Sequence, residues 1–259
     1  MAMTDQYTLK TLSNAIDVLS LFEREHSLTI KEIQQETHMN RTNLYRILYT
    51  LRSRGVLEVD PQTGEYRLGM KIIHLSSLLL QRLDVKTIAH PYLCELRDKI
   101  YETIHLVVLS NNLAAFVDKV VANEDINMGS YIGWTAPLYS TASGKLLLSS
   151  KEDEHINSYI NKTDFKKFTD CTLIKKEVFI QDIAKIRKQG YSIDAEEMVE
   201  GLTCFAAPIK NHREEVIAAV SISGPTTRML KNKEKILKEL LNNANNITES
   251  VNKTPQGTV

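Results

Sequence analysis

The sequence predicts an α+β protein of two domains, an N-terminal winged helix-turn-helix followed by a larger domain with a largely antiparallel sheet. Two observations carry this prediction. Residues 27–69 show two short helical patterns followed by a pair of strand-like runs, and strand clusters alternate with helical segments after residue 84. At 259 residues the chain is long enough for two hydrophobic cores. We place the first domain at 8–69, a linker helix at 70–83 and the second domain at 84–252.

Two helices, separated by one turn, are predicted near the start of this region. Ile30 and Ile33 lie three residues apart on one helical face, and Thr29 is placed to cap that helix. After a break at 38–40, the second helix has a core-facing stripe with i, i+3, i+4, i+7 spacing. Its members are Leu44, Ile47, Leu48 and Leu51.

Flanking segments complete the first domain. Residues 9–25 keep apolar residues at helical spacing, and we expect this first helix to contribute to a dimer face. Gly55 is suited to end the second helix of the helix-turn-helix. Apolar and polar residues alternate on both sides of 60–64, which predicts a hairpin, the wing of the domain.

The outward side of the second helix carries charge of one sign. Between residues 40 and 54 there are four arginines and no acidic residue, whereas a solvated helix normally mixes signs. Arginines beside Asn, Thr and Tyr suit a phosphate backbone and base edges. A solvated basic face remains the alternative, because residues 1–70 hold 8 Lys and Arg against 9 Asp and Glu. We therefore expect a dimer, which would supply the phosphate contacts that one domain lacks.

The rest of the chain alternates helices and strands. The linker helix over 70–83 is apolar on more than one side, so we expect it to pack against a partner chain. The further predicted elements are a helix over 84–101 that breaks or kinks near Pro91, a hairpin over 103–120, a strand over 125–131, helices over 141–150 and 177–189, strands over 203–209 and 216–223, and a helix over 228–251.

Polar residues in the second domain could face one small ligand. Residues 140–145 are mostly small and open a helix, whose first amides, at Ser143 and Gly144, suit a carboxylate or phosphate. Ser221 and Ser223 share one face of a strand, because side chains repeat every second residue. Each feature also has a purely structural explanation, a helix cap for the first and tolerated strand residues for the second.

Two more residues are candidates for the same ligand site. Asp194 follows a predicted helix end, and Cys204 lies on a strand next to that of the serines. Cys204 could instead be a small core residue, the commonest role of a free cysteine. Alternatively it could be the nucleophile of a hydrolase or thiol enzyme, although the sequence indicates no base for it. A scaffold with neither activity nor ligand is a third hypothesis.

The sequence contains no motif of other enzymes or of metal sites. Gly144 and Lys145 lack the remaining residues of a P-loop, and the seven histidines form no HExxH motif or i,i+4 pair. We predict no catalytic residue, metal or cofactor. The adjacent pairs Glu196–Glu197 and Glu214–Glu215 suit solvated loops better than acid/base work.

The cysteine count and hydropathy bear on the cell compartment. Cys94, Cys171 and Cys204 are odd in number and far apart, which fits neither a disulfide framework nor a metal pair but does fit a reducing compartment. No cleavable N-terminal signal and no run of about 18 apolar residues is present. We therefore expect a cytoplasmic protein without membrane contact.

The chain resembles the IclR-type bacterial transcriptional regulators over residues 9–229. Five blocks in the same order carry the resemblance. They are 40–48, 64–69, 140–147, 190–209 and 216–225.

The resemblance implies a winged helix-turn-helix, a linker helix and a GAF-like effector domain. It implies a homodimer or a dimer of dimers that regulates genes of small-molecule catabolism, with repression favoured over activation. Implied contacts to operator DNA are Arg41, Thr42, Asn43, Tyr45 and Arg46, with Gln62 and Thr63 in the wing. Implied contacts to the effector, a small organic acid or sugar acid, are Met128, Ala142, Ser143, Asp194, Cys204, Ser221 and Ser223.

The chain departs from the family pattern at two places. Family members often have Gly-Ala or Ala-Leu where this chain has Ala142-Ser143, and usually an acid where it has Ala195. The first departure lies in the expected ligand seat, so the identity of the effector does not transfer.

Overall fold

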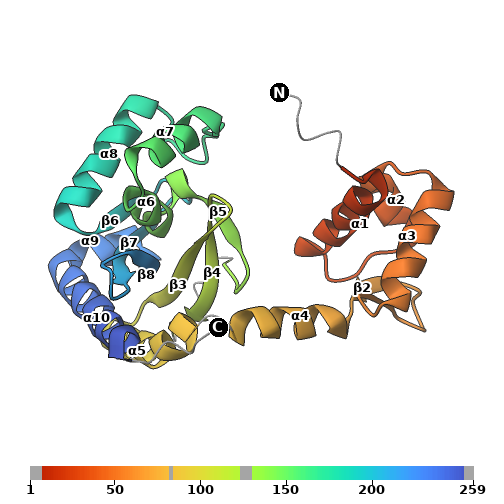
Figure 1. The fold of residues 1–259 in the computed structure, drawn as a ribbon, viewed down its shortest axis with the longest axis horizontal. Helices are drawn as coiled ribbons and strands as arrows, with labels where there is room; N and C mark the ends of the chain where they lie inside the picture. Colours follow the sequence, from red (N-terminus) through yellow and green to blue (C-terminus); the bar gives the residue numbers. More distant parts are fainter. Residues whose placement is uncertain (1–7, 82–83, 123–129, 254–259) are drawn as a thin grey trace. The chain divides into compact units, whose positions relative to one another are not determined.

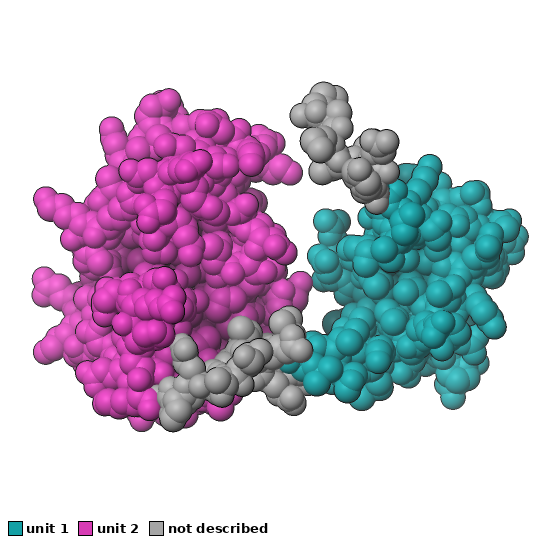
Figure 2. Space-filling model, viewed as in Figure 1, with its two compact units in different colours: residues 1–82 teal, residues 83–259 magenta. Residues whose placement is uncertain are grey.

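The computed structural model divides at Arg82/Leu83 into two compact units, the first with one hydrophobic core and the second with one on each face of its sheet (Figures 1 and 2). The structure describes residues 8–81, 84–122 and 130–253. Within these ranges no helix is both long and apolar enough to cross a membrane.

The N-terminal unit is a winged helix-turn-helix, as predicted. Its elements are α1 (Lys10–Ser20), a 3₁₀ turn (Leu21–Glu23), α2 (Ile30–Thr37), α3 (Arg41–Ser53), the antiparallel strands β1 (Leu57–Val59) and β2 (Tyr66–Leu68), and α4 (Met70–Gln81). The core contains the predicted stripe, with Leu44 and Leu48 fully buried against Val18 and Ile33.

Local capping explains where these helices begin and end. The Thr29 hydroxyl accepts from the Glu32 N–H at 3.3 Å, and the Glu32 carboxylate accepts from the Thr29 N–H at 2.7 Å, which is a capping box. The side chain of Asn40 accepts from the Asn43 N–H at 2.9 Å to start α3. Gly55 ends α3 with φ of +69°, the left-handed conformation that glycine adopts without strain.

The second unit is built on a six-stranded antiparallel sheet. Its strands are β3 (Thr103–Ser110), β4 (Leu113–Val120), β5 (Thr135–Pro137), β6 (Ser192–Ala195), β7 (Leu202–Lys210) and β8 (Val216–Pro225), in the spatial order β5-β4-β3-β8-β7-β6. On one face lie α5 (Asp84–Ile100), α9 (Thr226–Lys231) and α10 (Lys233–Lys253); on the other lie α6 (Ala142–Ser149), α7 (Asp153–Lys162) and α8 (Lys176–Gln189), as Figure 1 shows.

The strand register decides which side chains face α6. Cys204 is paired with Ser223 on one side and with Asp194 on the other, so these three residues form a row across β8, β7 and β6. Ser221 lies two residues from Ser223 on the same face, while Ile222 between them belongs to the opposite core. The predicted common face of the two serines is confirmed.

Several predicted elements differ in the structure. α5 continues through Pro91, so the predicted break does not occur; packing against β3, β4 and α10 outweighs the hydrogen bond that proline cannot make. The predicted strand over 125–131 lies mostly outside the described residues, and its described end is not strand. The predicted helix over 228–251 is two helices, divided at Asn232. Three elements, α7, β5 and β6, were not predicted.

Candidate functional site

The outer face of α3 presents arginine, threonine and tyrosine side chains. Arg41, Thr42, Tyr45 and Arg46 are exposed, as predicted, and so is Tyr49. None of the four arginines of 40–54 forms an ion pair with an acid of the described chain. Their charge is therefore available to a partner such as a phosphate backbone.

Two parts of this face differ in their surroundings. The Arg41 guanidinium lies 5.5 Å from the centre of the Tyr45 ring, and its Nη2 donates to Tyr45 Oη at 3.4 Å. This cation–π contact, worth about 0.5–1 kcal/mol at an exposed site, favours one orientation of the two side chains. Asn43 is partly buried and lines a surface groove beside α1 together with Arg46. The predicted DNA contacts thus occupy an outer face and a flank of the same helix.

The wing turn is held by one aspartate. Asp60 Oδ1 accepts from the backbone N–H groups of Gln62 at 2.8 Å and Thr63 at 3.2 Å. Both residues are exposed, as the predicted wing contact requires.

In the second unit, the predicted effector residues gather around a small cavity between the sheet and α6. The cavity has a volume of about 50 Å³. Six of the eight predicted residues line it: Ala142, Ser143, Asp194, Cys204, Ser221 and Ser223. The described lining contains one carboxyl group and no lysine or arginine. Met128 lies outside the described residues.

Gly144 is the exception among the predicted residues. Its N–H donates to Thr141 Oγ1 at 3.1 Å, which caps α6 and removes that amide as a ligand contact. A Cβ at this position would lie 2.6 Å from the Leu138 carbonyl oxygen, so glycine is needed for close packing. The predicted ligand contact from Gly144 is therefore corrected. The amides of Ala142 and Ser143 precede the first intrahelical donor, Lys145, and are left for a ligand.

Eight lining residues of the cavity were not predicted. They are His105, Phe116, Ser130, Trp134, Thr141, Met198, Val199 and Leu202. His105 Nε2 lies 2.9 Å from Ser130 Oγ, while its buried Nδ1 has no hydrogen-bond partner among the described residues. Burial lowers the pKa of His105 to about 3, so the ring is neutral. Its place opposite Ser221 in the β3–β8 register was not readable from the sequence.

A buried lysine joins three elements behind the cavity. Lys145 on α6 is 1% exposed and lies 2.5 Å from Glu197 Oε1 and 2.8 Å from Asp182 Oδ2. Burial alone would lower the pKa of Lys145, but Glu197 and then Asp182 outweigh it and raise this pKa. The sequence-based expectation of a solvated Glu197 is wrong, because the turn after β6 folds inward. Glu214 and Glu215 are exposed, as expected.

Asp194 connects this ion cluster with the cavity. Its Oδ1 accepts from the Glu197 N–H at 2.7 Å, and the residue is 2% exposed. Burial, followed by the nearby Glu197 charge, raises the pKa of Asp194 from an ordinary 3.8 to about 7. Burial also raises the pKa of the Cys204 thiol. A thiol that resists ionisation is a poor nucleophile, which argues against a thiol enzyme at this position.

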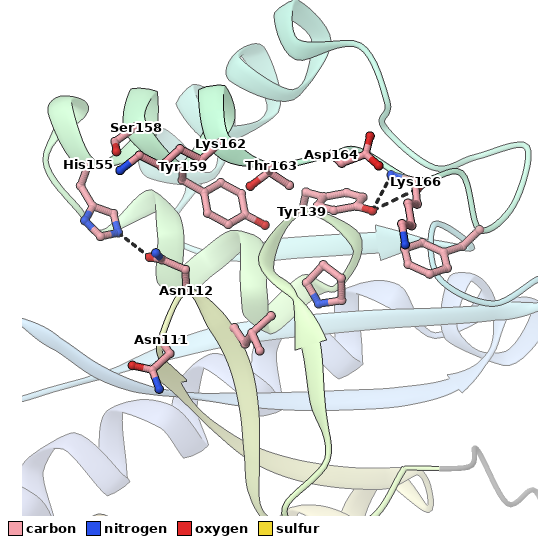
Figure 3. Close-up of a pocket in the computed structure, with 13 residues that line it drawn as sticks. Asn111, Asn112, Tyr139, His155, Ser158, Tyr159, Lys162, Thr163, Asp164 and Lys166 are labelled. Atoms are coloured by element: carbon pink, nitrogen blue, oxygen red, sulfur yellow. Dashed lines mark hydrogen bonds between the residues drawn. The ribbon is translucent and has the colours of Figure 1, made fainter. Parts of the chain in front are cut away.

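A larger and more open cleft lies on another part of the unit. It has a volume of about 480 Å³ and is lined by the turn between β3 and β4, by α7 and by the segment after α7. Figure 3 shows His155 Nε2 near Asn112 Oδ1, at 3.1 Å, and Tyr139 Oη bonded to the backbone of Lys166. Most of its charged side chains are exposed, and it contains none of the predicted residues. The small cavity, with its buried polar groups, is the stronger candidate.

Metal chemistry has no support in the described ranges, where no group of three or more His, Cys, Asp or Glu side chains is placed to hold an ion.

Comparison with known proteins agrees with both halves of the chain. Residues 77–249 match the bacterial transcriptional regulator IclR C-terminal domain, and residues 11–61 match the IclR helix-turn-helix domain. The chain belongs to the IclR family. As an IclR-family member it is a DNA-binding transcriptional regulator rather than an enzyme.

The relatives of this IclR-family chain are similar over most of their length. The regulator XynR of Escherichia coli strain K12 is 31% identical over 85% of this chain and 88% of its own. The acetate operon repressor of Salmonella typhimurium is 30% identical over 85% and 82%. An IclR homologue from Microbacterium hydrocarbonoxydans, solved with 4-hydroxybenzoate, has a TM-score of 0.82 over 93% and 99% at 21% identity, which shows the shared fold.

Removing the buried cation should destabilise the second unit strongly. We expect Lys145→Met to lower its free energy of unfolding by about 3–5 kcal/mol, because Glu197 and Asp182 would be left together without a cation. Trp134 is the one tryptophan of the chain, so its fluorescence during urea unfolding reports on this unit. Lys162→Met, at an exposed site on α7, is the control. A loss below about 1 kcal/mol for Lys145→Met would contradict the role given to the ion cluster.

The raised pKa of Asp194 predicts a stability that falls with increasing pH. Between about pH 4 and pH 7 the unfolded chain has released the Asp194 proton while the folded chain still holds it, so each increase in pH favours unfolding. Asp194→Asn should remove this decrease in stability with increasing pH, because asparagine does not titrate. The variant should gain stability relative to the wild type between about pH 5 and pH 8, by up to a few kcal/mol.

The same urea unfolding, followed by Trp134 fluorescence across this pH range, measures the effect. Glu154→Gln, which removes an exposed carboxyl on α7, should leave the pH dependence of the wild type unchanged. A constant difference between Asp194→Asn and the wild type at all pH values would show that Asp194 is ionised throughout.

Proposed function

We propose that this protein is a homodimeric, ligand-responsive repressor whose α3 and wing bind operator DNA and whose buried cavity binds a small organic acid. The observation that carries the proposal is the row of polar side chains from three strands, which faces the two free amides at the start of α6. The acetate operon repressor among the relatives supports repression as the mode of action.

The DNA-binding role rests on the outer face of α3. Arginine is suited to guanine edges and to phosphates, and Asn43 could pair with adenine through its amide. Because Asn43 is partly buried, Arg41, Thr42 and Tyr45 are the residues of α3 best placed to contact DNA directly. Asn43 and Arg46 would contact DNA from the side of the helix. Gln62 and Thr63 would contact the backbone beside the groove.

Dimerisation is supported by apolar side chains that the N-terminal unit leaves in solvent. Leu9, Leu12 and Ile16 are each more than half exposed and follow helical spacing along α1. On α4, Met70 and Ile73 are also more than half exposed, and Leu78 is 45% exposed. Solvent-exposed apolar stripes of this kind favour a partner chain. Two or four copies would double or further increase the number of phosphate contacts.

The acid-binding role rests on the chemistry of the cavity. Helix N-termini stabilise anions, and the amides of Ala142 and Ser143 lack intrahelical acceptors. Ser221 and Ser223 supply hydroxyl donors from the sheet. Asp194 would repel a carboxylate when ionised, but its raised pKa keeps part of the population neutral near pH 7. A hydroxyl on the ligand could then meet Asp194 while its carboxylate meets α6. A volume of about 50 Å³ favours a ligand of few atoms.

Loss of one arginine from α3 should weaken DNA binding. We expect Arg41→Ala to lower operator affinity by about 1–3 kcal/mol, or roughly tenfold to a hundredfold. Fluorescence anisotropy with labelled duplexes that tile the DNA flanking its own gene provides the measurement. Arg213→Ala, which removes an exposed arginine of the second unit, is the matched control. Equal affinity of Arg41→Ala and the wild type would remove α3 from its proposed role.

Binding of small acids should be visible through Trp134, which lines the cavity. A panel of acetate, lactate, pyruvate and 4-hydroxybenzoate is titrated while the fluorescence of Trp134 is followed. For the acid that binds, Ser221→Ala and Ser223→Ala should each weaken binding by about tenfold, because each loses a hydrogen bond to a charged group.

Ser158→Ala, which changes the open cleft of Figure 3, should leave this binding unaltered. Binding of methylammonium or cyclohexanol in place of every acid would overturn the proposed anion seat.

A further inference from the structure

A thiol, an imidazole and a carboxylate are in line where α5 packs against β4. Cys94 Sγ lies 3.7 Å from His90 Nε2, and His90 Nδ1 lies 2.7 Å from Asp118 Oδ2. His90 and Cys94 are four residues apart and so share one face of α5. None of the three residues lines the effector cavity or belongs to the DNA-binding unit.

A β-bulge aims the carboxylate at α5. The β3–β4 register pairs Leu106 with Asp118 but Val107 with Phe116, so Val117 is an extra residue. Phe116 and Asp118 therefore point to opposite faces of the sheet rather than to the same one. Leu106 belongs to the core under α5 and α10, and Asp118 opposite it points the same way. Asp118 is 3% exposed, while about half of the His90 side chain is in solvent.

The order of these groups is the one that proteins use to activate a cysteine nucleophile. When Nδ1–H donates to the Asp118 carboxylate, Nε2 is the ring nitrogen left to accept the thiol proton. Arg97 follows Cys94 by three residues and is held on the same flank, where its Nη1 donates to the Val121 carbonyl at 3.2 Å. Arg97 is itself paired with Asp98, at 2.5 Å, so His90 is the group placed to activate the Cys94 thiol.

We propose that Cys94 is a reactive thiol which small-molecule disulfides modify reversibly. His90 Nε2 takes the proton from Cys94, and the thiolate attacks one sulfur of the disulfide. A new S–S bond forms to Cys94 while the S–S bond of the small molecule breaks. The departing thiolate takes the proton back from His90. The disulfide is the oxidant, since one of its halves leaves as a reduced thiol.

The other two cysteines provide internal references in the same chain. Cys171 is exposed and Cys94 is partly exposed, so accessibility alone would make Cys171 react faster. Cys204 lines the effector cavity and is partly exposed like Cys94, but the raised pKa of its thiol should make it the slowest of the three. Activation by His90 should make Cys94 react faster than Cys171.

The test measures alkylation of the full-length protein by iodoacetamide, with the rate at each cysteine followed by peptide mass spectrometry. In the wild type Cys94 should react at least about tenfold faster than Cys171. His90→Gln, at a half-exposed position, should bring the rate of Cys94 to that of Cys171 or below. The rate at Cys171 should stay the same in both proteins. Asp118→Asn should slow Cys94 as well, because the carboxylate positions His90.

The reversible step is tested with oxidised glutathione. The intact mass should increase by one glutathionyl group, the increase should disappear in Cys94→Ser, and dithiothreitol should reverse it. Unchanged Trp134 fluorescence verifies that each variant is folded. The proposal fails if Cys94 reacts more slowly than Cys171 in the wild type, or if His90→Gln leaves its rate unchanged, since the contact would then be packing only.

Discussion

The strand register of β6, β7 and β8 is the constraint on which the second unit depends. It brings Asp194, Cys204 and Ser223 into one row that faces the cavity, and it keeps Ile222 in the core on the opposite face of the sheet. A slip of one residue would exchange the two faces of a strand, burying hydroxyls in the core and placing isoleucine in the cavity. The cavity is therefore specified as strongly as the core, because the same pairing produces both.

A buried cluster of charged side chains lies beside the cavity and holds Asp194 in place. Lys145 is the shared cation of Glu197 and Asp182 and offsets the desolvation of both carboxylates, and the backbone N–H of Glu197 donates to Asp194. Such clusters contribute little net stability compared with apolar packing, but they require one arrangement of the elements that they join. Here they join α6, α8 and the turn after β6, and two of these contribute residues to the cavity. A ligand that alters the charge of Asp194 would act directly on this arrangement.

In the N-terminal unit, the residues that stabilise the fold are separate from those that face a partner. Its core is small and apolar, and its helix ends are capped by Thr29, Asn40 and Gly55. The arginines of its polar face have no acidic partner in the described part of the chain. Unpaired arginines on a rigid helix are suited to a polyanion because no internal ion pair has to be broken first. The exposed apolar side chains of α1 and α4 are the surface on which the proposed dimer would form.

Local patterns in the sequence predicted whatever depends on neighbours in the chain. The stripe of Leu44 and Leu48, the capping box of Thr29 and the common face of Ser221 and Ser223 all follow from fixed periods and short-range hydrogen bonds. Asp194 and Cys204 were candidates from their positions in the sequence, family resemblance added Met128 and Ala142, and the register brings Asp194 and Cys204 into the same row as Ser223.

Only the tertiary structure decided which distant residues meet. Lys145 forms an ion pair with Glu197, which lies 52 residues further along the chain. His105 lies opposite Ser221, and a bulge turns Asp118 toward His90. The continuity of α5 through Pro91 and the burial of Glu197 were also invisible, because packing against remote elements reversed the local preference. The sequence by itself determined most of the elements and their faces. The pairing of those faces required the folded chain, since long-range contacts depend on strand order and register that no local period encodes.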